Sequence, residues 1–179
     1  MTESASWRHE IAQRLADAFA TNPAVDAIFL GGSTARGQAD RYSDIEIGVF
    51  WDRDPTKAER AQAISAAGGE LHLQYELEGI YWEDNLFAGR DAAGTPQSGQ
   101  FVELSHIRTT EIERILDRLS TDPDPDEDVL NLLSGVADSL PLHGIEQVSR
   151  WRSLARRYPD ELARAVVRRH GQIEFFWRW

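Results

Sequence analysis

The sequence predicts an α+β fold, with a mixed sheet of about five strands flanked by helices and a helical segment at the C-terminal end. Short apolar runs bounded by turn residues alternate with helical patterns along most of the chain, whereas only helical patterns follow residue 121. The acidic, proline-containing stretch TDPDPDED separates these two parts. We therefore expect one domain at residues 1–121 and a C-terminal helical region at residues 122–179.

Hydrophobic periodicity and helix-ending residues define the expected elements. Apolar residues recur at helical spacing over residues 7–20, and the β-branched run at 25–30 is typical of a buried strand. Ser33 or Thr34 is expected to cap a short helical turn that Gly37 ends. In order, we expect a helix at 7–20, a strand at 25–30, a turn at 33–37, a strand at 44–51, a helix at 54–67, strands at 71–77, 79–87 and 100–107, and helices at 109–119, 128–140, 146–157 and from 158 onward.

The later boundaries follow from the same kinds of signal. Side chains alternate between apolar and other types over residues 44–51, which is typical of a strand. Pro55 opens the following helix, and Gly68 ends it. Thr109 or Thr110, with Glu113 after it, resembles a capping box that starts a helix.

Composition limits the kinds of site that the chain can form. There is no cysteine, so any metal must be held by carboxylates, histidines, backbone groups or water, which favours hard cations such as Mg²⁺. No apolar run approaches the roughly 20 residues that span a bilayer, and the N-terminus does not resemble a signal peptide, so we expect a cytoplasmic protein without membrane contact. The net charge is −11, and this acidity makes nucleic acid an unlikely partner while it suits a cationic small molecule.

Two neighbouring motifs indicate a phosphate and metal site. The strand at 25–30 runs into Gly31, Gly32 and Ser33, a turn whose free backbone N–H groups could hold phosphate. Asp44 and Glu46 lie two residues apart, so they point to one face of the next strand and repel each other unless a cation neutralises them. A divalent ion is the simplest such cation.

The combination resembles the signature of the polymerase-β-like nucleotidyltransferase superfamily. The matching strings are IFLGGS at 28–33 and SDIEI at 43–47, and the longer stretch is similar to stand-alone bacterial enzymes that modify aminoglycosides or lincosamides. The resemblance implies a nucleotidyltransferase fold and a third carboxylate on a later strand, for which Glu103 is our choice. The competing acids on neighbouring strands are Glu76, Glu78, Glu83 and Asp84. Glu46 stands where many members have a second aspartate.

The resemblance implies transfer of a nucleoside monophosphate, with AMP from ATP as the expected case. Asp44 and Glu46 would hold Mg²⁺, expected as two ions, on the triphosphate of ATP or another nucleoside triphosphate. Glu103 would bind the second ion or act as general base. Gly31, Gly32 and Ser33 would bind the phosphates, with Arg36 preferred over Arg41 as the neutralising cation.

The expected acceptor is a hydroxyl group of a small molecule such as an aminoglycoside-like antibiotic, and pyrophosphate is released. Trp82, Glu83 and Asp84 could line its pocket, although core packing is an equal alternative for Trp82. Modification of a protein or tRNA, as in toxin–antitoxin enzymes, and a non-catalytic nucleotide sensor are the alternatives. The aromatic end at 175–179 would dock on the body, form a homodimer, or mark a shortened helical region.

Overall fold

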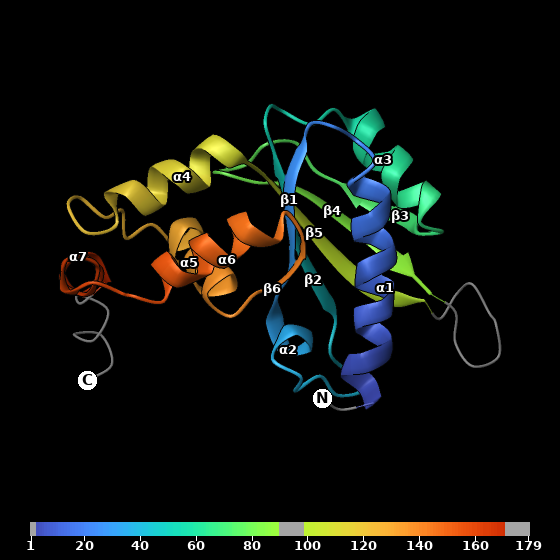
Figure 1. The fold of residues 1–179 in the computed structure, drawn as a ribbon, viewed down its shortest axis with the longest axis horizontal. Helices are drawn as coiled ribbons and strands as arrows, with labels where there is room; N and C mark the ends of the chain where they lie inside the picture. The colour runs from blue at the N-terminus through green and yellow to red at the C-terminus, as the bar shows by residue number, and fades with distance from the viewer. Residues whose placement is uncertain (1–2, 90–98, 171–179) are drawn as a thin grey trace, which may run out of the picture.

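The computed structural model describes residues 3–89 and 99–170 (Figure 1). Helices and strands alternate through the first part, as the sequence predicts. The elements are α1 (Glu3–Phe19), β1 (Val25–Leu30), α2 (Gly32–Ala35), β2 (Ile45–Trp51), α3 (Lys57–Ala66), β3 (Glu70–Gln74), β4 (Trp82–Ala88), β5 (Gln100–Arg108), α4 (Thr109–Arg118), α5 (Glu127–Ala137), β6 (Leu140–His143), α6 (Ile145–Ala155) and α7 (Asp160–His170).

The strands form one mixed sheet in the order β3-β4-β5-β2-β1-β6. Strands β2 and β5 are parallel, and the other neighbouring pairs are antiparallel. Because β2 and β5 are joined by a long stretch that contains α3, β3 and β4, their parallel pairing brings together residues far apart in the sequence. This central pair carries the acidic residues of interest.

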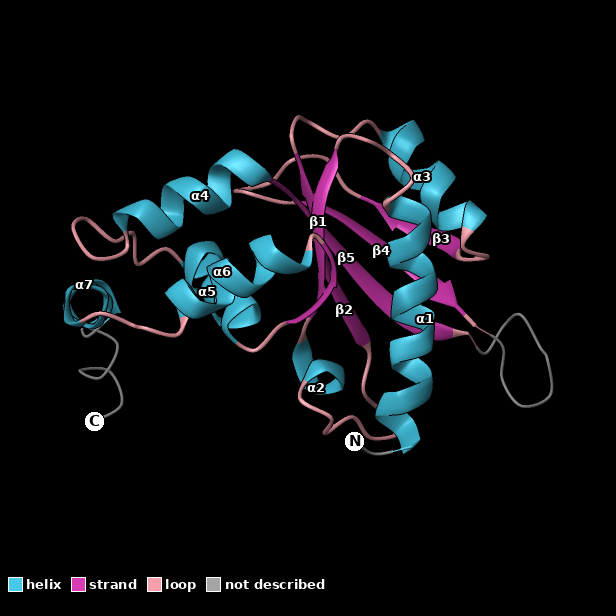
Figure 2. Ribbon diagram, in the orientation of Figure 1, coloured by secondary structure: helices cyan, strands magenta, loops and turns pink. Residues whose placement is uncertain are grey.

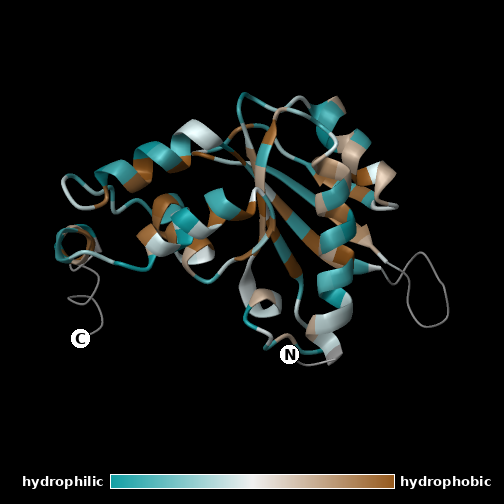
Figure 3. Cartoon of the chain, in the orientation of Figure 1, coloured by the Kyte–Doolittle hydropathy of each residue, from teal (hydrophilic) through white to brown (hydrophobic). Residues whose placement is uncertain are grey.

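Helices cover the sheet unequally on its two faces (Figures 1 and 2). Helices α1 and α3 pack on one face over a continuous apolar core that includes Leu15, Ile28 and Ile47. The other face carries a second core, in which Phe29 and Phe50 of the sheet belong to one cluster with buried side chains of α4, α5, α6 and α7. Hydrophobic residues are frequent along the strands of the sheet, whereas the helices carry many hydrophilic residues (Figure 3). The second core covers only part of its face.

The α+β class is confirmed, but the sheet has six strands rather than about five. The additional strand, β6, lies in the region expected to be entirely helical and pairs with β1. It contains Pro141, and proline argues against a strand when only the sequence is known. The proline is tolerated here because β6 is at the edge of the sheet. The helix expected to continue through Leu140 is shorter, because α5 ends at Ala137.

Two expected helix caps are wrong, for local reasons. Gly31 occupies the N-cap position of α2, and the hydroxyl of Thr34 donates instead to the carbonyl oxygen of Asp44 at 3.3 Å. Strand β5 runs directly into α4, so Arg108 is the N-cap there and makes no side-chain cap. A true capping box is found at α3, between Thr56 and Glu59.

No helix in the ranges 3–89 and 99–170 combines the length and the apolar character needed to cross a membrane. The aromatic stretch at 175–179, for which a dimer contact was one expectation, lies outside the described residues. The division at residue 121 stays a prediction.

Candidate active site

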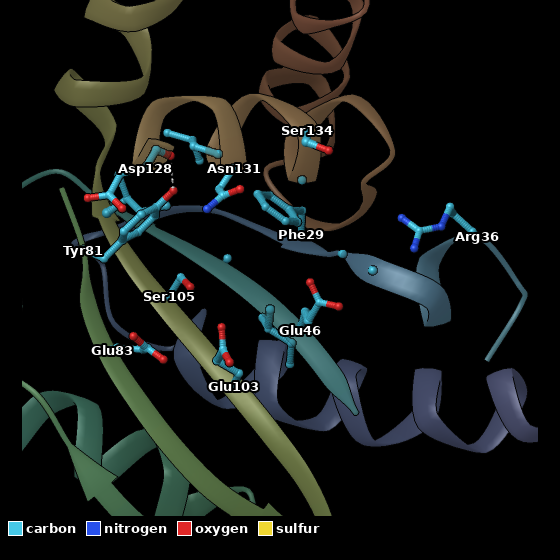
Figure 4. Close-up of a pocket in the computed structure, with 17 residues that line it drawn as sticks. Phe29, Arg36, Glu46, Tyr81, Glu83, Glu103, Ser105, Asp128, Asn131 and Ser134 are labelled. Carbon is cyan, nitrogen blue, oxygen red and sulfur yellow. Dashed lines mark hydrogen bonds between the residues drawn. The ribbon is translucent and has the colours of Figure 1, made fainter. Parts of the chain in front are cut away.

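A cavity lies between helix α5 and the part of the sheet that the C-terminal helices leave uncovered (Figure 4). Its volume is about 460 Å³, which is in the usual range for small-molecule sites. Strands β1, β2, β4 and β5 supply one wall. Of the residues expected from the sequence to bind metal or phosphate, five line this cavity: Gly31, Gly32, Arg36, Glu46 and Glu103.

The glycine turn after β1 is shaped to let a carboxylate approach the backbone. Gly32 has a φ of 60°, a conformation that glycine adopts at little cost. A Cβ atom at this position would collide with the side-chain carboxylate of Glu46. The N–H of Gly31 donates to the carbonyl oxygen of Glu46 at 2.8 Å, which joins the turn to β2. The turn and Glu46 therefore form one packed unit.

Glu46 and Glu103 are direct partners across the parallel β2–β5 pair. Loss of solvent contact raises the pKa of Glu46, the charge of Asp44 raises it further, and Arg36 partly lowers it. Loss of solvent contact is also the main reason that the pKa of Glu103 is raised, followed by the charges of Glu83, Glu46 and Asp44. Several carboxylates thus share a small region without enough positive charge to compensate them.

Asp44 lies immediately before β2 and is half-buried. It is not among the residues that line the cavity, although its negative charge raises the pKa values of both Glu46 and Glu103. Asp44 is therefore at the edge of the cluster of carboxylates that Glu46 and Glu103 form. Because β2 begins at Ile45, the common strand face expected for Asp44 and Glu46 stays a prediction.

The two other expected phosphate contacts are placed differently from each other. Ser33 lies in α2, where its carbonyl oxygen accepts a hydrogen bond from the N–H of Gln38 at 2.9 Å, and it does not line the cavity. Arg36 lines the cavity at the α2 end and lies 3.7 Å from the carboxylate of Asp138 (Figure 4). Its side chain is 45% exposed, so it is free to meet an anionic ligand.

The opposite end of the cavity is acidic and was only partly expected from the sequence. Glu83, Tyr81 and Asp128 lie there, away from Arg36 (Figure 4). The hydroxyl of Tyr81 donates to the backbone carbonyl of Asp128 at 2.7 Å and so connects the turn before β4 to the start of α5. The contribution of α5 has no local sequence signal, because Asp128 and Tyr81 are far apart in the chain.

Burial raises the pKa values of the two acids at this end. For Glu83 the charges of Asp84 and Glu78 raise the pKa further. For Asp128, whose pKa is raised mainly by desolvation, Asp126 adds the next largest effect. This end of the cavity therefore has a negative potential, which favours a cationic ligand.

Trp82 and Asp84, which the sequence suggested for an acceptor pocket, lie on the other face of the sheet. Trp82 is buried there, and Asp84 is fully buried, with its carboxylate 2.5 Å from Nη1 of Arg60 and 3.1 Å from Nε2 of His106. Side chains alternate along β4, so only Glu83 of these three residues points to the cavity. Asp84 is thus excluded as a partner of Glu46 by strand geometry.

The side chains around the cavity decide whether the expected Mg²⁺ could be bound here. Within the described residues, no group of three or more histidine, aspartate or glutamate side chains is arranged to hold a metal ion. Mg²⁺, however, is commonly bound by one or two carboxylates that substrate phosphates and water complete. Glu46 and Glu103, with Asp44 close to both, provide such oxygen ligands and an uncompensated negative charge. The residues therefore fit a magnesium–nucleotide complex.

Comparison with known proteins identifies the family of this chain. A family model described as the nucleotidyltransferase domain matches residues 11–117, more than half of the chain, and this range includes the glycine turn and all three carboxylates. The chain therefore belongs to the nucleotidyltransferase domain family.

Solved structures show likeness over much of this chain. A Cid1 poly(U) polymerase crystal structure matches 76% of this chain and 39% of its own, with 12% identity and a TM-score of 0.45. A structure of Cid1 in complex with its short product ApU matches 76% and 40%, with 11% identity and a TM-score of 0.38. This chain thus spans about two fifths of those proteins. No curated protein matches the sequence. The antibiotic-modifying subfamily and the exclusion of nucleic acid stay predictions.

Proposed function

We propose that this enzyme transfers a nucleoside monophosphate, with AMP from ATP as the leading case, to a hydroxyl group of a small cationic molecule of the aminoglycoside type. Pyrophosphate is the second product. The observation that carries this proposal is the juxtaposition of the Gly32 turn, Glu46 and Glu103 in one cavity whose far end is acidic.

The cavity has an order of charges that suits a nucleotide donor. Arg36 is at the α2 end beside the glycine turn, where a triphosphate would gain a cation and the N–H groups that begin α2. Asp44, Glu46 and Glu103 would hold Mg²⁺, which, when bound, neutralises phosphate charge and makes the α-phosphorus more open to attack. In this proposal the reactive phosphate would lie over the β2–β5 pair.

The chain's own residues orient the two reactants. The turn and Arg36 would align the pyrophosphate as the leaving group, opposite the acceptor hydroxyl. The bond from the acceptor oxygen to the α-phosphorus forms as the bond from that phosphorus to the bridging oxygen breaks. The hydroxyl proton passes to a carboxylate or to water, and Glu103 is the carboxylate placed beside Glu46 for that role or for metal binding.

The acidic end of the cavity is the basis for the acceptor class. Glu83 and Asp128 would attract ammonium groups, whereas the phosphates of a nucleic acid would be repelled from them. We therefore propose an amine-bearing, hydroxylated small molecule rather than RNA. A cytoplasmic location is proposed with it, because the donor is a nucleoside triphosphate.

An acceptor screen tests this proposal. Purified protein with Mg²⁺ is incubated with each labelled nucleoside triphosphate and with aminoglycosides, lincosamides, unrelated polyols, total tRNA and a protein extract, and pyrophosphate release is measured. The proposal expects labelled product with an amine-bearing small molecule, and none with Glu46→Gln. Label incorporated only into RNA or protein would overturn the acceptor class, and nucleotide binding without pyrophosphate release in every mixture would indicate a sensor.

A further inference from the structure

Asp44 precedes the first paired residue of β2, Ile45, yet the peptide groups on either side of it are anchored. The carbonyl oxygen of Ser43 accepts hydrogen bonds from Nε of Arg8 at 3.0 Å and from Nε2 of Gln100 at 2.9 Å. The carbonyl oxygen of Asp44 accepts from the hydroxyl of Thr34 at 3.3 Å. Three separate elements therefore hold this short connection into β2.

Arg8 is an unusual residue for such a task. It lies on α1, and its side chain is buried, with 1% of the residue exposed. Its Nη1 also donates to the carbonyl oxygen of Ser4 at 3.0 Å, and its guanidinium stacks on Trp7 at 4.2 Å from the ring centroid. Burying a guanidinium is costly unless its hydrogen bonds and charge are compensated. The nearby negative charges are those of Asp40 and Asp44.

The loop before Ser43 is fixed from the other side. Asp40 Oδ1 accepts from the N–H of Tyr42 at 2.9 Å and from the N–H and the hydroxyl of Ser43, each at 3.0 Å. This turn orients Ser43 so that its carbonyl faces Arg8 and Gln100. The geometry therefore restrains the residue before Asp44 through its N–H, its hydroxyl and its carbonyl group.

Gln100 links this restraint to the third carboxylate. It is the first residue of β5, the strand that carries Glu103 opposite Glu46. Because strand β5 holds both Gln100 and Glu103, the Gln100 bond to Ser43 fixes Asp44 relative to Glu103 as well as to β2. Arg8 adds the same restraint from α1.

We propose that Arg8 and Gln100 are positioning residues that hold the peptide before Asp44, so that its carboxylate stays beside Glu46 and Glu103. This inference rests on the proposed function, in which these carboxylates bind the metal of the nucleotide complex. Neither residue touches the reacting groups. Each acts through the Ser43 carbonyl.

The experiment uses the full chain and Mn²⁺ alone, with its affinity measured by electron paramagnetic resonance. The variants are Arg8→Lys, Arg8→Met, Gln100→Leu and, as a matched control, Arg14→Met, because Arg14 is an exposed arginine of the same helix. Loss of one such hydrogen bond is expected to weaken Mn²⁺ binding roughly tenfold in the first three variants. The control should bind as the wild type does.

Arg8→Lys separates positioning from charge, because lysine keeps the positive charge and loses the Nε donor. Wild-type affinity in Arg8→Lys together with loss in Arg8→Met would overturn the proposal in favour of simple charge balance. A lower melting temperature with unchanged Mn²⁺ affinity in Arg8→Lys and Gln100→Leu would show a purely structural role and would also overturn it.

Hydrogen exchange gives a readout that does not depend on metal binding. Peptides covering residues 40–45 should take up deuterium faster in Arg8→Lys and Gln100→Leu than in Arg14→Met. Unchanged exchange would refute the restraint itself. If exchange changes but wild-type Mn²⁺ binding is insensitive to Asp44→Asn, the restraint stands and the proposed metal function fails.

Discussion

Glu46 and Glu103 face each other as register partners on parallel strands, and each lies in a setting that disfavours its charge. Such a pair destabilises the folded protein when no cation is bound, because the raised pKa values mean that ionisation of the two glutamates costs stability. It becomes useful when a cation is present. The two glutamates therefore connect the stability of this protein with its proposed chemistry.

Replacing Glu103 with glutamine should stabilise the protein and inactivate it. The amide keeps the shape of the side chain and removes a charge that Glu83, Glu46 and Asp44 repel. We expect the free energy of unfolding near pH 7 to rise by about 0.5–1 kcal/mol, and nucleotidyl transfer to fall by at least about 100-fold. Urea unfolding and pyrophosphate release measure the two effects.

Glu59→Gln is the matched control for this change. Glu59 is hydrogen-bonded to Arg53 and the start of α3, and these contacts hold its pKa well below the usual range. Its replacement should lower stability and leave activity unchanged. A Glu103→Gln protein that is less stable and still active would contradict the role given to Glu103.

Replacing Gly32 with alanine should lower both the stability of the protein and its affinity for ATP. The residue has a positive φ, and the new methyl group would displace the Glu46 carboxylate. We expect about 1 kcal/mol of destabilisation and a loss of ATP affinity of roughly tenfold or more, measured by calorimetric titration with Mg²⁺.

Gly68→Ala separates the two effects. Gly68 also has a positive φ, of 76°, but nothing lies within 4 Å of the Cβ that would be added. Its alanine variant should lose similar stability and bind ATP normally. Equal loss of ATP affinity in both variants would mean that the approach of Glu46 to Gly32 has no part in nucleotide binding.

Replacing Glu83 with glutamine should weaken binding of the acceptor and leave binding of the nucleotide donor unchanged. Glu83 lines the end of the cavity opposite Arg36. For a cationic acceptor we expect KM to rise by about tenfold, from loss of about 1–1.5 kcal/mol of ion pairing, with KM for ATP unchanged. Glu76→Gln is the control, because Glu76 pairs with Lys57 at 2.8 Å outside the cavity. An unchanged acceptor KM would argue against the acidic end as the acceptor site.

The buried histidine on the opposite face should make stability depend on pH. The indole N–H of Trp51 donates to Nδ1 of His106 at 3.2 Å, so Nε2 carries the proton and donates to Asp84 in neutral His106. Burial lowers the pKa of His106, although Asp84 opposes this effect. The unfolded chain therefore binds the proton more readily than the folded one.

Neutral His106 therefore stabilises the protein more at high pH than at low pH. The stability contribution is complete above the unfolded pKa of about 6.5 and is lost as the pH falls from there toward the lower folded pKa. Between about pH 8 and about pH 5.5, the wild type should lose on the order of 1 kcal/mol more than His106→Gln. Urea unfolding at both values measures this difference, with the exposed His72→Gln as control. Equal losses in all three proteins would refute it.

Local pattern in the sequence was enough to predict much of this fold. Strand β1 has the expected bounds, because a β-branched apolar run followed by two glycines has few other conformations. Alternation over residues 44–51 predicts that Glu46 faces away from Ile45 and Ile47, which are buried. Strand β6 escaped prediction because its four residues include proline and gain their conformation from pairing with β1.

The sequence by itself determined the glycine turn, the Asp44–Glu46 spacing and the face of β2 on which Glu46 lies, since these depend on backbone geometry over a few residues. Only the tertiary structure decided which distant residues meet them. The parallel register of β2 and β5 places Glu103 opposite Glu46, and the alternation of β4 turns Asp84 away into the core. Pairing between distant strands is selected by packing of the whole sheet, so local periodicity cannot specify it.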